Sequence, residues 1–197
     1  MEIHHSRFII ISAPSGSGKT TLVHALMDRY PYFEFSISAT TRSPRSYEIN
    51  GHHYHFMTVP EFKDRIENEE FIEYEEVYEG RYYGTLKSEI KRIHQAGKTP
   101  LLDIDVVGGI NVKEKFQDKA LSIFIQTPSL DELERRLRKR GSDQEEEIQK
   151  RLKKAAFEMT FKKYFDATVI NDDLEAATDA LAKVVLPFLN KEPKKGV

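Results

Sequence analysis

The sequence contains no cysteine, so none of its 197 residues can enter a disulfide framework. It also lacks any apolar run close to the roughly 18 residues that a membrane-spanning helix needs, which excludes such a helix. No basic region followed by an apolar stretch opens the chain, so we expect no secretory signal. Together these absences predict a cytoplasmic protein whose length suits one domain with its own buried core.

An excess of positive charge is missing as well. The chain carries 30 basic and 32 acidic residues, which gives a formal net charge of −2. Because no global positive field attracts polyanions, we expect no nucleic-acid partner and no membrane binding. Any anion site must therefore be local. The adjacent His4 and His5 have no further metal ligands beside them, a pattern typical of a solvated terminus.

Short apolar runs alternate with helical stripes along most of the chain. Runs that predict strands of a buried parallel sheet lie at 8–12, 35–39, 100–105, 122–125 and 167–170. Stripes that predict helices follow the first strand and recur at 86–93, 129–140, from 142 onward, and at 174–184. Helices between strands predict an α/β fold with a central parallel sheet flanked by helices.

Residues of about 39–85 have a different texture. Polar and aromatic residues alternate at 53–56 and 71–75, which predicts antiparallel strands with one exposed face. Between them Thr58 and Glu61 have the spacing of a capping box, so we expect a short helix there. The segment therefore predicts an inserted subdomain of mixed strands and helix.

The segment APSGSGKT at 13–20 matches the phosphate-binding loop, with Ala13 where glycine is commoner. It lies between a predicted strand and a predicted helix, as phosphate binding requires. Backbone N–H groups can then face phosphate oxygens, while Lys19 neutralises their charge and Thr20 offers a hydroxyl to Mg²⁺. A serine-glycine turn with an incidental lysine is the alternative. The expected ATP contacts here are Ala13, Pro14, Ser15, Gly16, Ser17, Gly18, Lys19, Thr20 and Thr21.

Asp103 and Asp105 end the predicted strand at 100–105. Their carboxylates should emerge at the carboxyl edge of the sheet, where α/β folds bind ligands. Because side chains alternate along a strand, both should point the same way, and their repulsion favours a nearby cation or donor. One of them, with Asp103 as the candidate, could hold the water shell of the magnesium ion. An ordinary pair of loop aspartates is the alternative.

Five further motifs occur along the chain: SATTRSPR at 38–45, then Glu48 with Asn50-Gly51 and Tyr54, then FIE at 71–73, YYGT at 82–85 and LDID at 102–105. Their order resembles the guanylate kinase family from about residue 8 to residue 184. The resemblance implies a P-loop kinase that transfers the γ-phosphoryl group of Mg-ATP to GMP or dGMP. It implies one domain over 1–197, with a core at about 7–38, 86–128 and 165–190, a GMP-binding subdomain at about 39–85 and a helical lid at about 129–164. Whether the protein is a monomer or a homo-oligomer stays open.

The resemblance also implies which residues hold GMP. By resemblance, the phosphate of GMP is held by Arg42, Arg45, Tyr54 and Tyr83. Its base is surrounded by Ser38, Glu73, Thr85 and one or both of Asp103 and Asp105. Arginine forks suit phosphate in general, although surface arginines are common. A carboxylate at Glu73 would accept from N1 and N2 of guanine but meet a lone pair on adenine, so we expect GMP over AMP. The alternative for Glu73 is a solvated acidic face.

Basic residues at 135–140 interleave with acidic ones, which favours an ion-paired surface over a nucleic-acid patch. By resemblance Arg136, Arg140 and Arg151 meet the ATP phosphates, and Asn171 lies near the adenine. The catalytic set is then Lys19, Arg42, Arg136 and Arg151. Two alternatives remain: an interaction module of the same fold without catalysis, and a P-loop kinase for another acceptor such as AMP.

Overall fold

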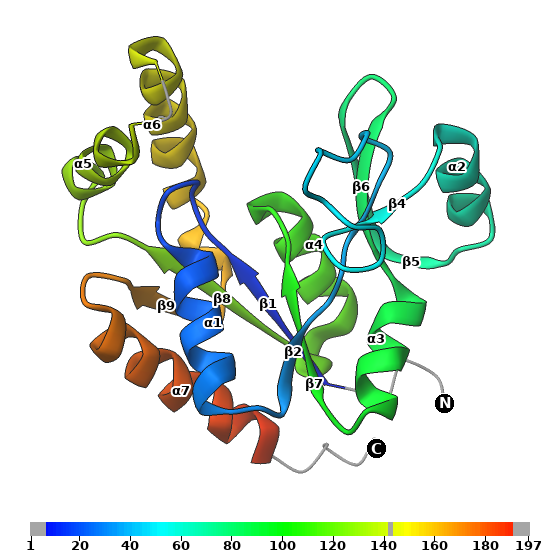
Figure 1. The fold of residues 1–197 in the computed structure, drawn as a ribbon. Coiled ribbons are helices and arrows are strands. Elements are labelled where there is room, and N and C mark those ends of the chain that lie inside the picture. The colour runs from blue at the N-terminus through cyan, green and yellow to red at the C-terminus, as the bar shows by residue number, and fades with distance from the viewer. Residues whose placement is uncertain (1–6, 142–143, 191–197) are drawn as a thin grey trace.

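The computed structural model describes residues 7–141 and 144–190, apart from the side chain of Arg140 (Figure 1). Its centre is a parallel sheet of five strands in the order β2-β7-β1-β8-β9. These strands are β1 (Phe8–Ser12), β2 (Phe33–Phe35), β7 (Thr99–Asp103), β8 (Ala120–Gln126) and β9 (Ala167–Ile170). The predicted α/β class is confirmed.

Strand β1 shows why this sheet is buried on both faces. Ile9 and Ile11 pack against α1 (Lys19–Arg29) and α7 (Leu174–Asn190). Phe8 and Ile10 pack on the opposite face, against α3 (Lys87–Gln95) and α4 (Val106–Phe116). Because alternate side chains face opposite layers, a continuous apolar strand needs helices on both sides.

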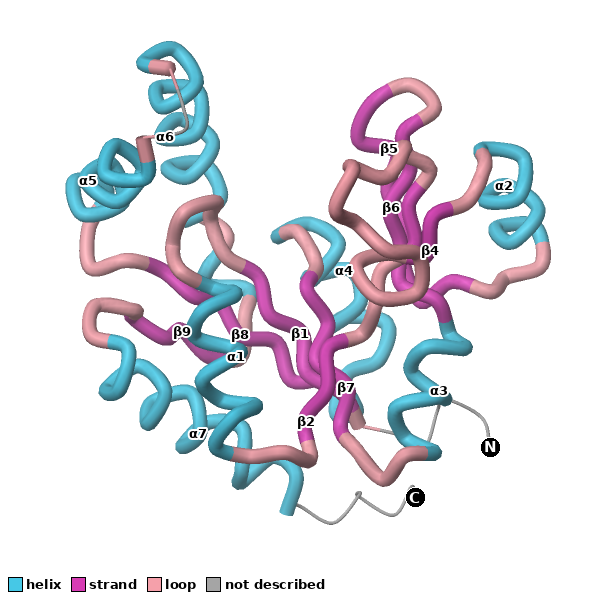
Figure 2. The backbone as a smooth tube through the Cα atoms, viewed as in Figure 1, coloured by secondary structure: helices cyan, strands magenta, loops and turns pink. Residues whose placement is uncertain are grey.

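A second sheet of four strands lies beside the first, as Figure 2 shows. Its order is β4-β3-β6-β5, with β3 (Ala39–Thr40), β4 (His55–Phe56), β5 (Phe71–Tyr78) and β6 (Arg81–Leu86). Helix α2 (Val59–Glu67) begins with the predicted capping box of Thr58 and Glu61. Phe62 of this helix stacks on Phe71 and Tyr82, which gives the second sheet a small core of its own.

Two strand predictions are wrong in this region. The apolar run at 35–39 is not one strand, because the chain leaves the central sheet after Phe35 and Ala39 pairs with Gly84 in the second sheet. The residues at 53–56 do not form an antiparallel strand either, since β4 pairs with β3 in parallel. A loop between β3 and β4 carries the chain back to the same end of the sheet, which makes the pair parallel.

Helix α4 has no counterpart among the predicted elements. The predicted strand at 100–105 ends at Asp103, and Asp105 is the N-cap of this helix. Its carboxylate accepts hydrogen bonds from the backbone N–H groups of Val107 at 2.7 Å and Gly108 at 3.0 Å. The two aspartates therefore belong to different elements, and only Asp103 ends a strand.

Helices α5 (Leu130–Arg140) and α6 (Glu145–Met159) stand on one side of the carboxyl edge of the central sheet, and the second sheet stands on the other (Figure 1). Helix α5 begins close to the predicted residue 129, where the Ser129 hydroxyl accepts from the N–H of Glu132. The predicted start of α6 at Ser142 lies outside the described residues, as do His4 and His5. Short 3₁₀ helices occur at Gln117–Lys119 and Lys162–Tyr164. Among the described residues, no helix has the length and apolar character to cross a membrane.

Candidate active site

The phosphate-binding loop forms between β1 and α1, as predicted. Gly16 and Gly18 have φ angles of 93° and 81°, in the left-handed region that glycine adopts at low cost. Lys19 begins α1, so the positive end of this helix faces the loop. A cavity of about 730 Å³ is lined by the whole segment 13–21. The loop therefore has the shape and polarity of an anion site.

Neighbouring elements hold this loop closely. A Cβ atom at Gly16 would lie 2.7 Å from Cδ2 of Leu137 in α5, and one at Gly18 would lie 2.5 Å from Nδ2 of Asn171. The buried Asn171 amide donates a hydrogen bond to the Ser17 carbonyl at 2.8 Å. Asn171 thus contacts the backbone of the loop, at the end of β9.

Lys19 forms an ion pair with Asp103 at the end of β7. Burial lowers the pKa of Lys19 to about 8, although the nearby carboxylates of Glu158 and Asp105 act in the opposite direction. All four residues line the cavity of the loop. The lysine is therefore held among carboxylates at the point where phosphates would compete for it.

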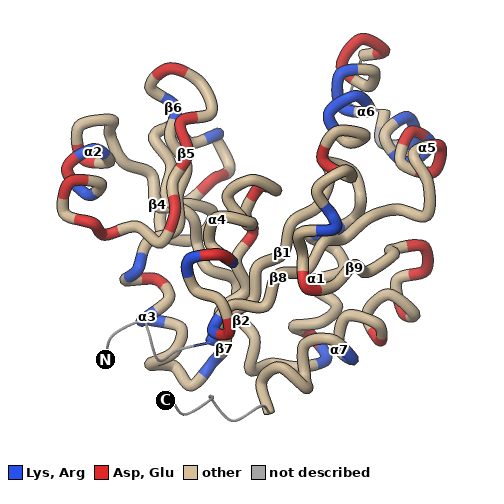
Figure 3. Tube along the Cα trace, turned by 180° about the vertical axis from the view of Figure 1, so that it is seen from behind, with Lys and Arg blue, Asp and Glu red and all other residues tan. Residues whose placement is uncertain are grey.

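Two of the three predicted lid arginines reach the same cavity. The Arg151 guanidinium donates to Oγ of Ser15 at 3.0 Å, and Nε of Arg136 lies 2.6 Å from the Glu132 carboxylate. The side chain of Arg140 lies outside the described part of the structure. Figure 3 shows basic and acidic residues interleaved along α5 and α6, in agreement with the predicted ion-paired surface.

A second cavity, of about 1060 Å³, adjoins the first. It brings together six of the predicted GMP contacts: Ser38, Tyr54, Glu73, Tyr83, Asp103 and Asp105. The two cavities share Thr20, Asp103, Ile104 and Asp105. A group bound in one cavity can therefore meet a group bound in the other at the carboxyl edge of the sheet.

Glu73 is a half-buried carboxylate in the lining of this cavity. Burial raises its pKa to about 7, and Oγ1 of Thr85 donates a hydrogen bond to it at 2.7 Å. The alternative of a solvated acidic face therefore does not hold for Glu73, whose neighbour Thr85 is itself buried. A carboxyl in such a place suits donors from a ligand that would favour its ionised form.

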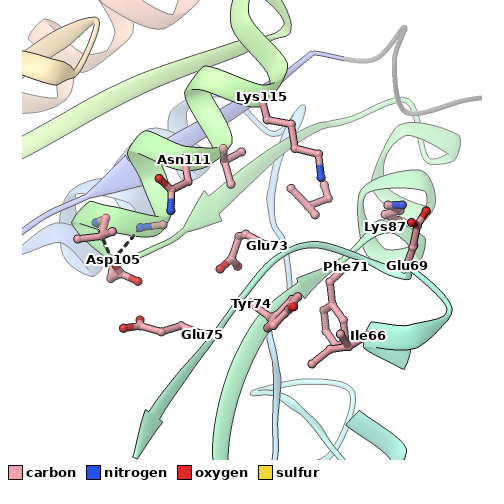
Figure 4. Close-up of a pocket in the computed structure, with 14 residues that line it drawn as sticks. Ile66, Glu69, Phe71, Glu73, Tyr74, Glu75, Lys87, Asp105, Asn111 and Lys115 are labelled. Atoms are coloured by element: carbon pink, nitrogen blue, oxygen red, sulfur yellow. Dashed lines mark hydrogen bonds between the residues drawn. The ribbon is translucent and has the colours of Figure 1, made fainter. Parts of the chain in front are cut away.

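Glu75 is a site residue that sequence reasoning missed. Figure 4 shows Glu73, Glu75 and Asp105 directed toward one another, beside a further space of about 600 Å³ between β5 and α4. A hydrogen bond with Asp105, together with burial, raises the pKa of Glu75 to about 7. Its position two residues after Glu73 on one strand was the available signal, because such residues share a face.

The predicted phosphate residues lie at the outer side of the second cavity. Arg42 donates two hydrogen bonds to Glu48, at 2.6 and 2.7 Å, and its guanidinium lies 5.0 Å from the ring centre of Tyr54. The rings of Tyr54 and Tyr83 are 6.1 Å apart. Arg45 is exposed and donates to the hydroxyl of Tyr47 at 3.0 Å. The tyrosines line the cavity, whereas the two arginines stand outside its lining.

The ion pair of Arg42 and Glu48 shifts the pKa of each group in the direction that favours its charged form. The hydrogen bonds raise the pKa of Arg42, and they lower the pKa of Glu48 to about 2. The Glu48 side chain is only 4% exposed and also accepts from the backbone N–H of Arg45 at 2.7 Å. Glu48, which carries no predicted role, therefore holds both arginines of the predicted phosphate site.

Residues 5–187 match the family model described as guanylate kinase. The chain belongs to the guanylate kinase family. It is 51% identical to the guanylate kinase of Bacteroides thetaiotaomicron, with 94% of this chain and 91% of the relative covered. It is 48% identical to that of Porphyromonas gingivalis, with coverage of 94% and 100%. The crystal structure of guanylate kinase from Anaplasma phagocytophilum matches with a TM-score of 0.73 and 31% identity, over 94% of this chain and 87% of that one.

These likenesses confirm the family that the five motifs predicted, and with it the prediction of a kinase. They cover nearly the whole chain, so the central sheet, the second sheet and helices α5 and α6 all belong to the guanylate kinase fold. The roles of individual residues depend on the geometry given above.

Proposed function

We propose that this guanylate kinase family protein transfers the γ-phosphoryl group of Mg-ATP to GMP, giving ADP and GDP. The observation that carries the proposal is the pair of adjoining cavities. One contains the phosphate-binding loop, the other is lined by the half-buried Glu73, and they share Asp103 and Asp105. Two nucleotides bound in this way would bring their phosphates together. Both are cytoplasmic metabolites, which fits the location predicted from the sequence.

The loop cavity is proposed for ATP. The N–H groups of the loop and the helix terminus would bind its phosphates, and Lys19 would leave Asp103 to neutralise them. Arg136 and Arg151 line the opposite wall, so lid helices α5 and α6 would complete the phosphate site. Closing them would also exclude water, which could otherwise hydrolyse ATP.

The residues of the loop also fit a magnesium ion that arrives with ATP. The Thr20 hydroxyl and the Asp103 carboxylate line one cavity, and hard oxygen donors are what Mg²⁺ takes. Among the described residues, no cluster of His, Cys, Asp and Glu could hold a metal alone. Bound there, the ion would offset phosphate charge during transfer.

The second cavity is proposed for GMP. Glu73 would accept from N1 and N2 of guanine, with Ser38 and Thr85 beside it. The phosphate would lie toward Tyr54 and Tyr83, within reach of Arg42 and Arg45 once these side chains turn from their present partners. The second sheet, about 39–85, would then be the GMP-binding subdomain.

The chemistry requires no general base from the protein. The phosphate of GMP has a second pKa of about 6, so at neutral pH it already presents an ionised oxygen nucleophile. The obstacle is the repulsion between this dianion and the γ-phosphate. Catalysis would therefore come from positioning and from the positive charge of Lys19, Arg42, Arg136 and Arg151.

The decisive experiment measures ADP release with Mg-ATP and GMP, AMP, CMP or UMP in parallel. We expect turnover with GMP and a preference over AMP of about 10⁴ in kcat/KM, because adenine leaves Glu73 unpaired. Faster turnover with AMP would assign the second cavity to another acceptor. Binding of GMP without ADP release under any condition would instead favour an interaction module.

A further inference from the structure

The chain crosses from the central sheet to the second sheet at two neighbouring points. The first crossing is the segment 36–38 between β2 and β3, and the second joins β6 to α3 at Leu86 and Lys87. Ser38, a proposed contact of the guanine base, is the last residue of the first crossing. The conformation of that crossing therefore sets where Ser38 lies relative to the central sheet.

Glu89, in the first turn of α3, joins the two crossings. Its side chain is only 3% exposed. It accepts a hydrogen bond from the backbone N–H of Ile37 at 3.2 Å, and bonds from Arg92 at 3.0 Å through Nε and 2.7 Å through Nη2. Nε2 of His55, on β4, lies 3.5 Å from Oε2 of Glu89. One carboxylate thus contacts the crossing, its own helix and the second sheet.

The bonds from Arg92 and Ile37 keep this buried group ionised. Burial alone would raise the pKa of Glu89, but these hydrogen bonds and the Arg92 charge hold it below its ordinary value. Arg92 is itself held at 2.6 Å by Glu34 on β2, which ties the network to the central sheet. A charged side chain is therefore fixed in a place where an apolar residue would cost less to bury.

The backbone of every residue of the crossing makes a hydrogen bond. The N–H of Ser36 donates to the Leu101 carbonyl of the central sheet at 2.9 Å, and the Ser38 carbonyl accepts from the N–H of His55 at 2.9 Å. Between them, the N–H of Ile37 has a side chain as its partner, namely Glu89. Glu89 therefore supplies the middle of three successive attachments that end at Ser38.

We propose that Glu89 is a positioning residue for GMP: by fixing the crossing at Ile37, it holds Ser38 in register with Glu73 across the guanine site. This role rests on the proposed function, since it concerns the same cavity. The proposal predicts that substitution of Glu89 impairs the use of GMP and not the use of ATP. The ATP loop is built from other elements, and within the described residues the hydrogen bonds of the Glu89 side chain go elsewhere.

The test compares Glu89→Ala, Glu89→Gln and the control Glu114→Gln, which removes an exposed carboxylate on α4. In Glu89→Ala the KM for GMP should rise about tenfold while the KM for ATP changes less than about twofold. Glu89→Gln keeps an acceptor for Ile37 and the shape of the side chain, so it should recover most of the loss. The control should match wild type.

Hydrogen exchange at the Ile37 amide supplies a readout that does not depend on activity. It should become faster in Glu89→Ala and remain slow in Glu89→Gln and in the control. A double variant with Ser38→Ala should show little further rise in the KM for GMP, because both changes act through one contact. Equal rises in both KM values, or an unchanged KM for GMP, would overturn the positioning role. Failure of wild type to phosphorylate GMP would instead count against the proposed function.

Discussion

The two cavities of this protein meet at Asp103 and Asp105, yet they are built from different materials. The longest contiguous part of the first wall is the segment 13–21, a glycine-containing loop that follows one buried strand and enters one helix. The residues that line the second come from separate parts of the chain: both sheets, α1 and the loop that precedes β4. A backbone wall suits phosphates, which every nucleotide carries, whereas side chains can distinguish one base from another.

The charged groups differ in the same way. On the first side Lys19 is paired with one carboxylate that phosphates can displace. On the second side Arg42 is held by two hydrogen bonds to Glu48, and Glu73 is bonded to Thr85. Binding of GMP must therefore rearrange the partners of Arg42, whereas binding of ATP must displace one carboxylate from Lys19.

The largest expected effect is a loss of turnover at the first cavity. Lys19→Ala should lower kcat by about 10³, because it removes the side-chain cation at the phosphate loop. The variant should remain folded, since the ion pair that it loses is partly exposed and the loop is held by glycine and Asn171. Single-turnover kinetics and thermal unfolding check both statements. Substantial remaining turnover would contradict the role given to this loop.

A smaller effect is expected at the second cavity, where Arg42 and Arg45 should differ in their contributions to stability. Arg42→Gln should lower kcat/KM for GMP by about 10² and also lower the unfolding temperature, because it leaves the buried Glu48 carboxylate without its main partner. Arg45→Gln should lower kcat/KM by about tenfold without a change in stability, since Arg45 is exposed. Steady-state kinetics with thermal unfolding of both variants is the measurement. Wild-type kinetics in both variants would show that neither arginine contributes to the use of GMP.

The same contrast explains what the sequence could predict. The phosphate loop is contiguous, and its function depends on local conformation, so residues 13–20 could be assigned from the order of their amino acids alone. The central strand at 8–12 and the capping box of Thr58 and Glu61 are local patterns too, and both are present. Local chemistry decides these features, so the sequence suffices for them.

Errors occur where a distant partner decides the outcome. The run at 35–39 looks like one strand, but pairing with Leu101 and with Gly84 divides it between two sheets. The sequence does not predict helix α4 because two glycines lie in its first turn and weaken the helical pattern, while Asp105 resembles the end of a strand. The contacts of Glu89 with Ile37 and His55 are set by tertiary packing, which adjacent residues in the sequence do not reveal.

The smallest effect concerns protons on the second side. Because guanine N–H donors favour the ionised form of Glu73, whose pKa burial raises to about 7, GMP must displace a proton. The affinity for GMP should therefore rise about tenfold from about pH 6 to about pH 8. Isothermal titration with GMP measures this slope, and guanosine serves as a ligand without a titrating phosphate.

In the absence of nucleotide, the stability of the folded protein should instead fall as the pH rises. The folded pKa of Glu73 lies above its ordinary value of 4.5, so its stabilising proton is fully bound below that value and is lost as pH rises through about 7. Glu75 titrates in the same window, so Glu75→Gln is the matched control. Glu73→Gln should reduce the stability slope, to which Glu75 still contributes, and flatten the guanosine slope. A guanosine slope that survives Glu73→Gln would show that the proton belongs to another group, and the base would then be read elsewhere in the cavity.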